Sequence, residues 1–132
     1  MKYTNTLRIT FYADVGLPVE IQHNETADVV VIKKYQDYTL TLAPNENHTI
    51  KISLKDHPYQ KFLYIKKVYL GNLDITKLLH YDNICSVTLK ENNEIIGNFL
   101  EDLGLPDVMT IQLDKYFYST IIKYIDLIEI IK

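Results

Sequence analysis

The chain has 132 residues, of which 47% are hydrophobic and 23% are charged, and its formal net charge is −3. This length is typical of one folded domain, which we expect to span residues 1–132, and the composition argues against disorder. The acidic balance argues against nucleic acid as a partner, because proteins that neutralise phosphates carry clustered basic surfaces.

The single cysteine excludes an internal disulfide and any metal site built from several cysteines. No signal peptide is predicted, because the first residues, MKYTNTLRITFYAD, lack an apolar segment. The most apolar stretch, residues 116–131, is interrupted by three charged side chains and is too short to span a bilayer. These features predict a soluble protein without membrane insertion, in a compartment that stays unknown.

The first half of the chain shows several strand patterns. Residues 7–12 alternate apolar and polar side chains, as in a strand with one buried face. Gly16 and Pro18 are expected to end this strand, and a second short strand at 19–21 leads into a polar turn at 23–26. The β-branched run 29–32 predicts a central strand that is buried on both faces.

Alternation returns at 40–42 and, most clearly, at 50–54, which predicts a strand with one solvated face. The stretch 61–76 is expected to form a central hairpin, because Gly71 and Asn72 suit a two-residue loop with positive φ. The lysine pairs 33–34 and 66–67 put like charges on both faces of a strand. Such pairs favour an edge strand or a β-bulge.

In the second half, a single helical turn is expected near 76–79 and a second short helix at 98–104, with Asn98 as its cap and Gly104 as its stop. Strands are predicted at 84–89, 95–96 and 108–113. Residues 116–131 combine helical spacing with a β-rich composition, and we assign them to strands. The regular spacing of turn signals predicts an all-β, antiparallel β-sandwich, jelly-roll or immunoglobulin-like, with one or two helical turns in loops.

No catalytic motif is present in the sequence. Cys85 lies within a predicted strand, where burial would raise the pKa of the thiol and deny access to it. The four histidines lie in separate predicted loops without metal-ligand spacing. Loop carboxylates and amides could bind calcium, although no calcium-loop pattern fixes their geometry. We therefore expect no enzymatic activity and no cofactor, with calcium as an open alternative.

Tyrosine is the most informative residue type, because the chain has 11 Tyr and no Trp. An exposed tyrosine offers a flat apolar ring and a hydroxyl, which suits both sugar stacking and protein interfaces. Several tyrosines stand in or beside predicted turns, including Tyr35 and Tyr38. The candidate ligand-binding residues combine such tyrosines with neighbouring amides and carboxylates: Tyr59, Tyr81, Asp82, Asn83, Asn92 and Asn93.

Two segments, residues 68–76 and 124–130, resemble strand sequences of carbohydrate-binding β-sandwiches over a small part of the chain. With the tyrosines, they favour a non-catalytic binding module whose expected ligand is a carbohydrate. The alternative is a structural or protein-interaction subunit, such as a homo-oligomer or a viral or phage particle component, with residues 116–131 as its contact. A third hypothesis, a small hydrolase or other enzyme, has no motif in its favour. The tyrosines themselves have a simpler interpretation, in which AT-rich codon usage supplies them and they only cover the ends of the core.

Overall fold

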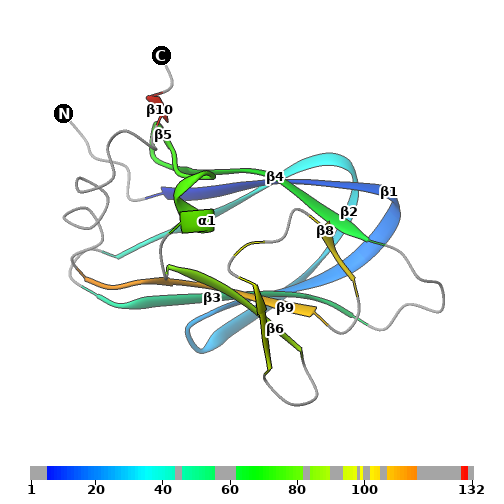
Figure 1. The fold of residues 1–132 in the computed structure, drawn as a ribbon. Coiled ribbons are helices and arrows are strands. Elements are labelled where there is room, and N and C mark those ends of the chain that lie inside the picture. Colours follow the sequence, from blue (N-terminus) through cyan, green and yellow to red (C-terminus); the bar gives the residue numbers. More distant parts are fainter. Residues whose placement is uncertain are drawn as a thin grey trace.

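The computed structural model describes residues 6–43, 46–55, 62–81, 84–89, 94–97, 99, 102–104, 107–115 and 129–130. Across these residues ten strands form one antiparallel sheet, which curls into an open half-barrel (Figure 1). The expected all-β antiparallel architecture is thus confirmed. A sandwich is not confirmed, because both arms of the curled sheet belong to the same open sheet.

In the part of the chain that the structure describes, the strands follow one another with a single short helix between the fifth and the sixth. Across the sheet their order is β10-β5-β4-β1-β3-β9-β6-β7, while β2 pairs with β1 and β8 pairs with β4. Their bounds are β1 (Thr6–His23), β2 (Thr26–Thr41), β3 (His48–Leu54), β4 (Leu63–Leu70), β5 (Leu73–Asp74), α1 (Leu78–Tyr81), β6 (Cys85–Leu89), β7 (Ile95–Gly97), β8 (Asp102–Leu103), β9 (Asp107–Leu113) and β10 (Glu129–Ile130).

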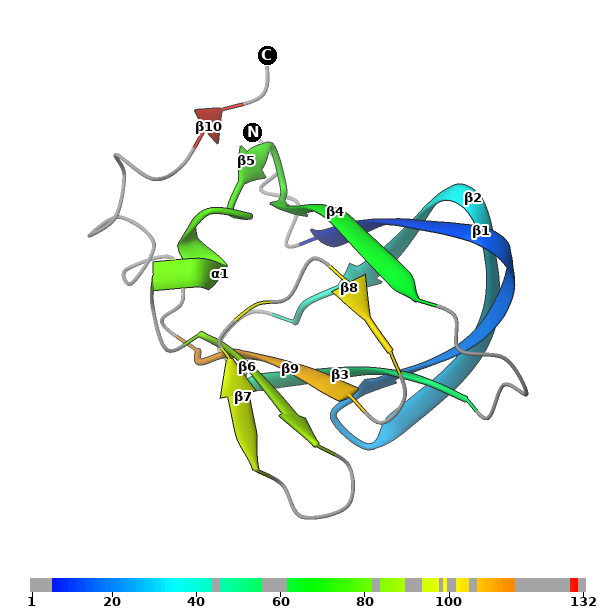
Figure 2. The ribbon, with the colours of Figure 1, turned by 45° about the vertical axis from the view of Figure 1, so that its right-hand side comes forward.

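The long β1–β2 hairpin joins the two arms of the sheet (Figure 2). β4 pairs with the first half of β1 and β3 pairs with the second half. Between the halves the β1–β2 register shifts from Ala13 to Leu17, and Lys34 on β2 has a φ of 58°. A bulge of this kind bends a strand without ending it. The predicted break at Gly16 and Pro18 is therefore wrong, because both residues lie where β1 bends and continues.

Both lysine pairs lie at bulges, as predicted. Lys33 lies opposite the register shift between β1 and β2, and Lys66 lies at the shift between β1 and β4. All four lysines are exposed. On β4, Lys66 is itself the extra residue of the bulge, and an extra residue lets consecutive side chains reach solvent. At the β1–β2 shift the extra residues lie on β1, opposite Lys33, and Lys34 has a positive φ.

The predicted hairpin turn at Gly71 and the predicted polar turn at 23–26 are confirmed. The first hairpin is not central, because its second strand, β5, has two residues and lies second from one end of the sheet. Leu70 pairs with Leu73 around Gly71, which has a φ of 58°, and His23 pairs with Thr26 around Asn24, which has a φ of 54°. A positive φ is readily adopted by Gly and tolerated by Asn, so the sequence chemistry matches both loops.

The helical predictions have different outcomes. α1 forms one turn close to its predicted place. The prediction of a second helix at 98–104 is wrong at Asp102 and Leu103. These two residues form β8, which pairs with Tyr64 and Leu63 of β4. Pairing with the otherwise open end of β4 outweighs the local capping signals there. Residues 116–128 lie outside the described part of the chain, whereas residues 129–130 pair with β5 as a strand.

The core fills the inside of the curl. β1 supplies alternate side chains to it along both halves, and β3, β4, β6 and β9 supply most of the rest. Cys85 is 1% exposed and free, as expected of a core residue, and burial raises the pKa of its thiol to about 12. Among the described residues no helix is long and apolar enough to cross a membrane.

The run 29–32 is not the central strand that its composition predicted. It belongs to β2, which pairs on one side only, with β1, among the described strands. Val29 is 52% exposed and Val31 is 60% exposed, whereas Ile32 is fully buried. A continuous β-branched run has the same local pattern in an edge strand as in a central one, so its sequence could not distinguish the two.

Candidate ligand-binding site

Three tyrosines form a row across the outer face of the β2–β1–β4 arm. Tyr12 lies opposite Tyr35 on β2 and opposite Tyr64 on β4. The ring centroids of Tyr12 and Tyr35 are 4.8 Å apart, those of Tyr12 and Tyr64 are 6.1 Å apart, and both pairs are tilted by 50°. These separations are typical of attractive aromatic pairs. We call these three residues the tyrosine row.

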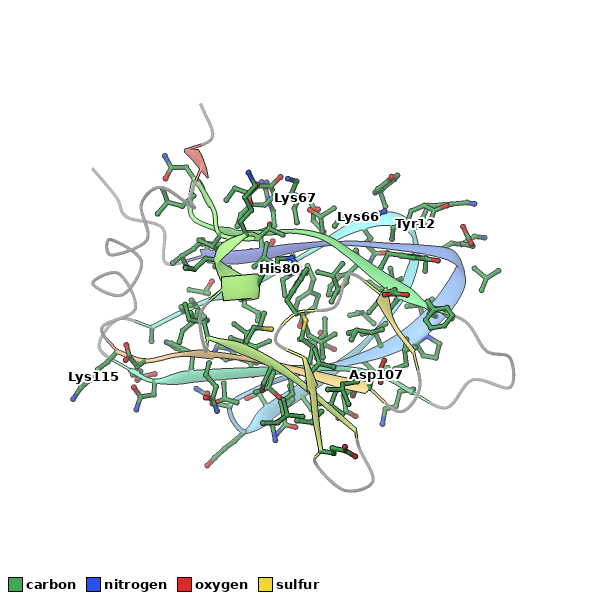
Figure 3. All side chains as sticks on the ribbon, viewed as in Figure 1. Tyr12, Lys66, Lys67, His80, Asp107 and Lys115 are labelled. Atoms are coloured by element: carbon green, nitrogen blue, oxygen red, sulfur yellow. The ribbon has the colours of Figure 1, made fainter. Side chains whose placement is uncertain are left out.

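The alternation of β1 explains why the row faces outward. Leu7, Ile9 and Phe11 are fully buried, so the side chains between them point away from the core. Tyr12 is one of these, and the register then places the outward tyrosines of β2 and β4 on either side of it. Figure 3 shows Tyr12 and Lys66 on this outer side, near the bend of the hairpin. Tyr35 is the most open member of the row, at 70% exposure.

Polar groups adjoin the ring faces. The hydroxyl of Tyr12 donates a hydrogen bond to Asp14 Oδ1 at 2.8 Å. That hydrogen bond, followed by burial, raises the pKa of Tyr12, so its phenol stays protonated at neutral pH. Two residues before Tyr12 on β1, the hydroxyl of Thr10 donates a hydrogen bond to Asp37 Oδ1 at 2.7 Å. The exposed carboxylates of Asp14 and Asp37 therefore lie beside the tyrosine row, where they can accept hydrogen bonds from a ligand.

A cation completes this surface. Lys66 Nζ lies 5.3 Å from the ring centroid of Tyr64 and 5.9 Å from that of Tyr12. Both distances are within the range of cation–π attraction. Further along the same face the guanidinium of Arg8 lies 4.4 Å above the ring of Tyr69. The surface thus combines ring faces, acceptors and a cation, which suits a polar ligand that also has an apolar face.

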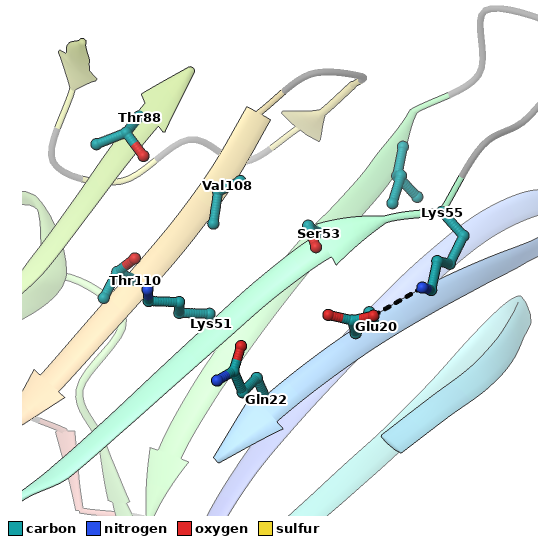
Figure 4. Close-up of a pocket in the computed structure, with 9 residues that line it drawn as sticks. Glu20, Gln22, Lys51, Ser53, Lys55, Thr88, Val108 and Thr110 are labelled. Atoms are coloured by element: carbon teal, nitrogen blue, oxygen red, sulfur yellow. Dashed lines mark ion pairs between the residues drawn. The ribbon is translucent and has the colours of Figure 1, made fainter. Parts of the chain in front are cut away.

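A separate shallow cavity lies on the outer face of the other arm, across β1, β3, β9 and β6 (Figure 4). Its volume is about 220 Å³, which is smaller than most small-molecule sites. Lys55 Nζ and Glu20 Oε2 form an ion pair of 2.8 Å within it. It offers no aromatic ring, so it is the weaker candidate; its lining residues are Glu20, Gln22, Lys51, Ser53, Leu54, Lys55, Thr88, Val108 and Thr110.

Two histidines that the sequence assigned to separate loops are in direct contact, which corrects that assignment. His23 Nε2 lies 2.9 Å from His48 Nδ1, and His48 Nε2 lies 2.8 Å from the carbonyl oxygen of Ala43. Because a carbonyl oxygen only accepts, His48 Nε2 donates to it, and His48 Nδ1 accepts from His23. Burial, followed by the proximity of His48, lowers the pKa of His23.

The histidine pair is a structural contact between the end of β1 and the start of β3. His48 is 2% exposed. Within the described residues no group of three or more histidine, cysteine, aspartate or glutamate side chains could hold a metal ion.

The predicted loop site stays a prediction. Tyr59, Asp82, Asn83, Asn92 and Asn93 lie outside the described residues. Tyr81 ends α1, and its side chain also lies outside the described part.

The structure instead brings together Tyr12, Tyr35 and Tyr64, of which only Tyr35 stood out as a turn tyrosine in the sequence. Tyr12 occupies a polar-face position of the first alternating strand. That position was the one local signal that this ring faces solvent. Comparison with protein-family models, with curated proteins and with solved structures returned no match for this chain.

Proposed function

We propose that this protein is a non-catalytic binding module whose ligand stacks on the tyrosine row, with a carbohydrate as the expected ligand class. One observation carries the proposal: rings from three neighbouring strands lie 4.8 and 6.1 Å apart beside carboxylates and an ammonium group. A sugar ring has an apolar face that can stack on such rings and hydroxyls that can donate to the carboxylates.

The position of the row on strands also supports binding. Side chains on paired strands are held more rigidly than side chains on loops, so less conformational entropy is lost when a ligand binds. Tyr12 is fixed further by its hydrogen bond to Asp14. Tyr35 is the most exposed member and therefore has the largest ring area left for a ligand to cover.

The test is a titration of the labelled protein with pooled xylo-, cello-, manno- and chito-oligosaccharides, followed by two-dimensional NMR. We expect shifts at the amides of β1, β2 and β4 around the row. For any sugar that binds, Tyr35→Ala should weaken the affinity about tenfold. Tyr35→Phe should retain most of it, because the ring face is preserved.

Tyr38→Phe is the matched control. Tyr38 lies on the same strand as Tyr35, but its side chain is on the inner side of the curl, where its hydroxyl contacts Asp28. Its substitution should leave sugar affinity unchanged. An oligosaccharide affinity that is the same in Tyr35→Ala and in the wild type would remove the tyrosine row as the site.

The second candidate function is a structural or protein-interaction subunit. The observation that favours it is the pair of exposed valines, Val29 and Val31, on the unpaired side of β2. Exposed apolar side chains beside a strand edge are typical of protein contacts.

A further inference from the structure

Among the described residues, β2 offers an edge that no other strand covers. β2 pairs with β1 along one side, and none of the described strands pairs with the other side. An uncovered edge presents backbone N–H and C=O groups that can pair with another strand. The lysines at the bulge obstruct part of this edge, but the segment 27–32 before them carries no lysine or arginine.

The hydrogen bonds of β1 show which backbone groups of β2 face outward. The carbonyl of Pro18 accepts from Lys55 N at 3.0 Å, and Asn24 N donates to Thr49 O at 2.9 Å. Even-numbered residues of β1 in this half thus bond toward β3. In an antiparallel ladder the odd-numbered ones then bond to the even-numbered residues of β2. Val29 and Val31 therefore direct their N–H and C=O groups to the free edge.

The same two residues place apolar side chains beside that edge. Val29 is 52% exposed and Val31 is 60% exposed, and Val15 at the nearby bend is 40% exposed. Val31 packs closely over Gly16, where an added Cβ would lie 3.2 Å from its Cγ1. Val31 therefore packs against the bend of β1, and a strand added to the edge would cover part of both valines.

The charges of the segment fit a second copy of itself in antiparallel orientation. Acidic residues stand at its start, Glu25 and Asp28, and basic residues stand at its end, Lys33 and Lys34. Antiparallel pairing places the acidic start of each copy against the basic end of the other. Parallel pairing would place like charges side by side, which is unfavourable.

We propose that two copies of this chain pair antiparallel through the β2 edge, about Val30. In this register Val29 of each copy lies opposite Val31 of the other, and both pairs exchange backbone hydrogen bonds. The contact lies within the arm before the bend, so the curvature at the bulge does not interrupt it. The interface is distinct from the tyrosine row, which lies beyond the bend.

Sedimentation equilibrium of the full chain tests the proposal. We expect the wild type to reach twice its monomer mass of 15.5 kDa. Val31→Lys should raise the dimer dissociation constant at least about tenfold, because it places a charge opposite Val29 of the other copy. Its side chain is largely exposed in the monomer, so the fold should be retained, which circular dichroism checks. Thr41→Lys is the control, since it adds the same charge to an exposed position of β2 outside the contact.

The register has its own test. Val30 lies opposite its own copy in a non-hydrogen-bonded pair, where Cα atoms are about 4.5 Å apart and a disulfide can form. Val30→Cys should form a covalent dimer under mild oxidation, while Cys85, at 1% exposure, stays reduced. A monomeric wild type, an unchanged dimer in Val31→Lys, or a dimer in which Val30→Cys does not cross-link would each overturn the proposal.

Discussion

The hydroxyl of Tyr38 donates a hydrogen bond of 3.0 Å to Asp28 Oδ2, although both residues belong to β2. In a straight strand ten residues span about 33 Å, so this contact requires β2 to double back on itself. The bend of β2 lies beside the β1–β2 register shift, where Lys34 has a φ of 58°. The contact joins the two halves of β2 across the opening of the curl.

We expect Tyr38→Phe to lower the free energy of unfolding by about 1 kcal/mol, because one hydrogen bond across the curl is lost while the ring is retained. Urea denaturation measures this change. Thr39→Ala, on the same strand but facing outward, should change stability by less than about 0.5 kcal/mol. Equal losses in the two variants would show that the hydroxyl of Tyr38 does not hold the arms together.

Stability should fall as the pH drops below 6.5, the ordinary pKa of histidine, because the pKa of His23 is lowered in the folded protein. The sign follows from proton binding: the unfolded chain takes up a proton at this site more readily than the folded one. The stabilisation is complete above that pH and declines as the pH falls toward the folded pKa.

Urea denaturation at a series of pH values between 5 and 8 measures the effect. His23→Gln should remove part of the pH dependence of the free energy of unfolding. The free energy of unfolding should change by about 1 kcal/mol, the value of one hydrogen bond. His80→Gln is the control, since His80 is exposed and lies on α1, away from the pair. A wild type whose stability is constant over this range would contradict the role assigned to the pair.

Among the carboxylates that the structure describes, Asp74 should make the stability of the protein most sensitive to acid. Its Oδ1 accepts from the hydroxyl of Thr76 at 2.6 Å and from the backbone N–H of Thr76 at 3.0 Å, and its Oδ2 lies 3.3 Å from Lys67 Nζ. Burial acts to raise the pKa of Asp74, but the hydrogen bonds from Thr76 and the contact with Lys67 outweigh it and lower the pKa. Its stabilisation is therefore present above 3.8, the ordinary pKa, and is lost as the pH falls through the lowered value.

Asp74→Ala should cost about 2 kcal/mol, because it leaves the backbone N–H of Thr76 without its acceptor. The hydroxyl of Thr76 would keep only its longer contact, 3.4 Å, with the carbonyl oxygen of Val68. The side chain of Lys67 is half exposed, so Lys67→Met should cost less than about 1 kcal/mol. Thermal and urea denaturation compare the two variants. A larger loss in Lys67→Met would mean that the ion pair, and not the contacts with Thr76, stabilises this turn.

The sequence predicted the features that depend on local chemistry. The loop at Gly71 is confirmed because a positive φ favours glycine at that position, and the lysine pairs at 33–34 and 66–67 mark bulges because adjacent charges need solvent on both faces. The alternation of apolar and polar residues at 50–54 predicted β3, because successive side chains of a strand point to opposite faces.

Features that depend on long-range pairing could not be predicted. Whether Gly16 and Pro18 end a strand or bend it depends on the ladders that β3 and β4 form with β1. The tyrosine row depends on register, because Tyr12, Tyr35 and Tyr64 meet only when three strands align. The contact between His23 and His48 likewise needs β1 and β3 side by side.

The β1–β2 hairpin, which both arms of the sheet share, also indicates the order in which the strands assemble during folding. Its turn closes only two residues between His23 and Thr26, so β1 and β2 can zip together with little loss of loop entropy. β3 and β9 meet only after a much longer chain segment has closed, since His48 pairs with Leu113. Contacts distant in sequence form slowly. Pulse-labelled hydrogen exchange during refolding should therefore protect the amides of β1 and β2 before those of β9, with the bent hairpin acting as the template on which both arms grow.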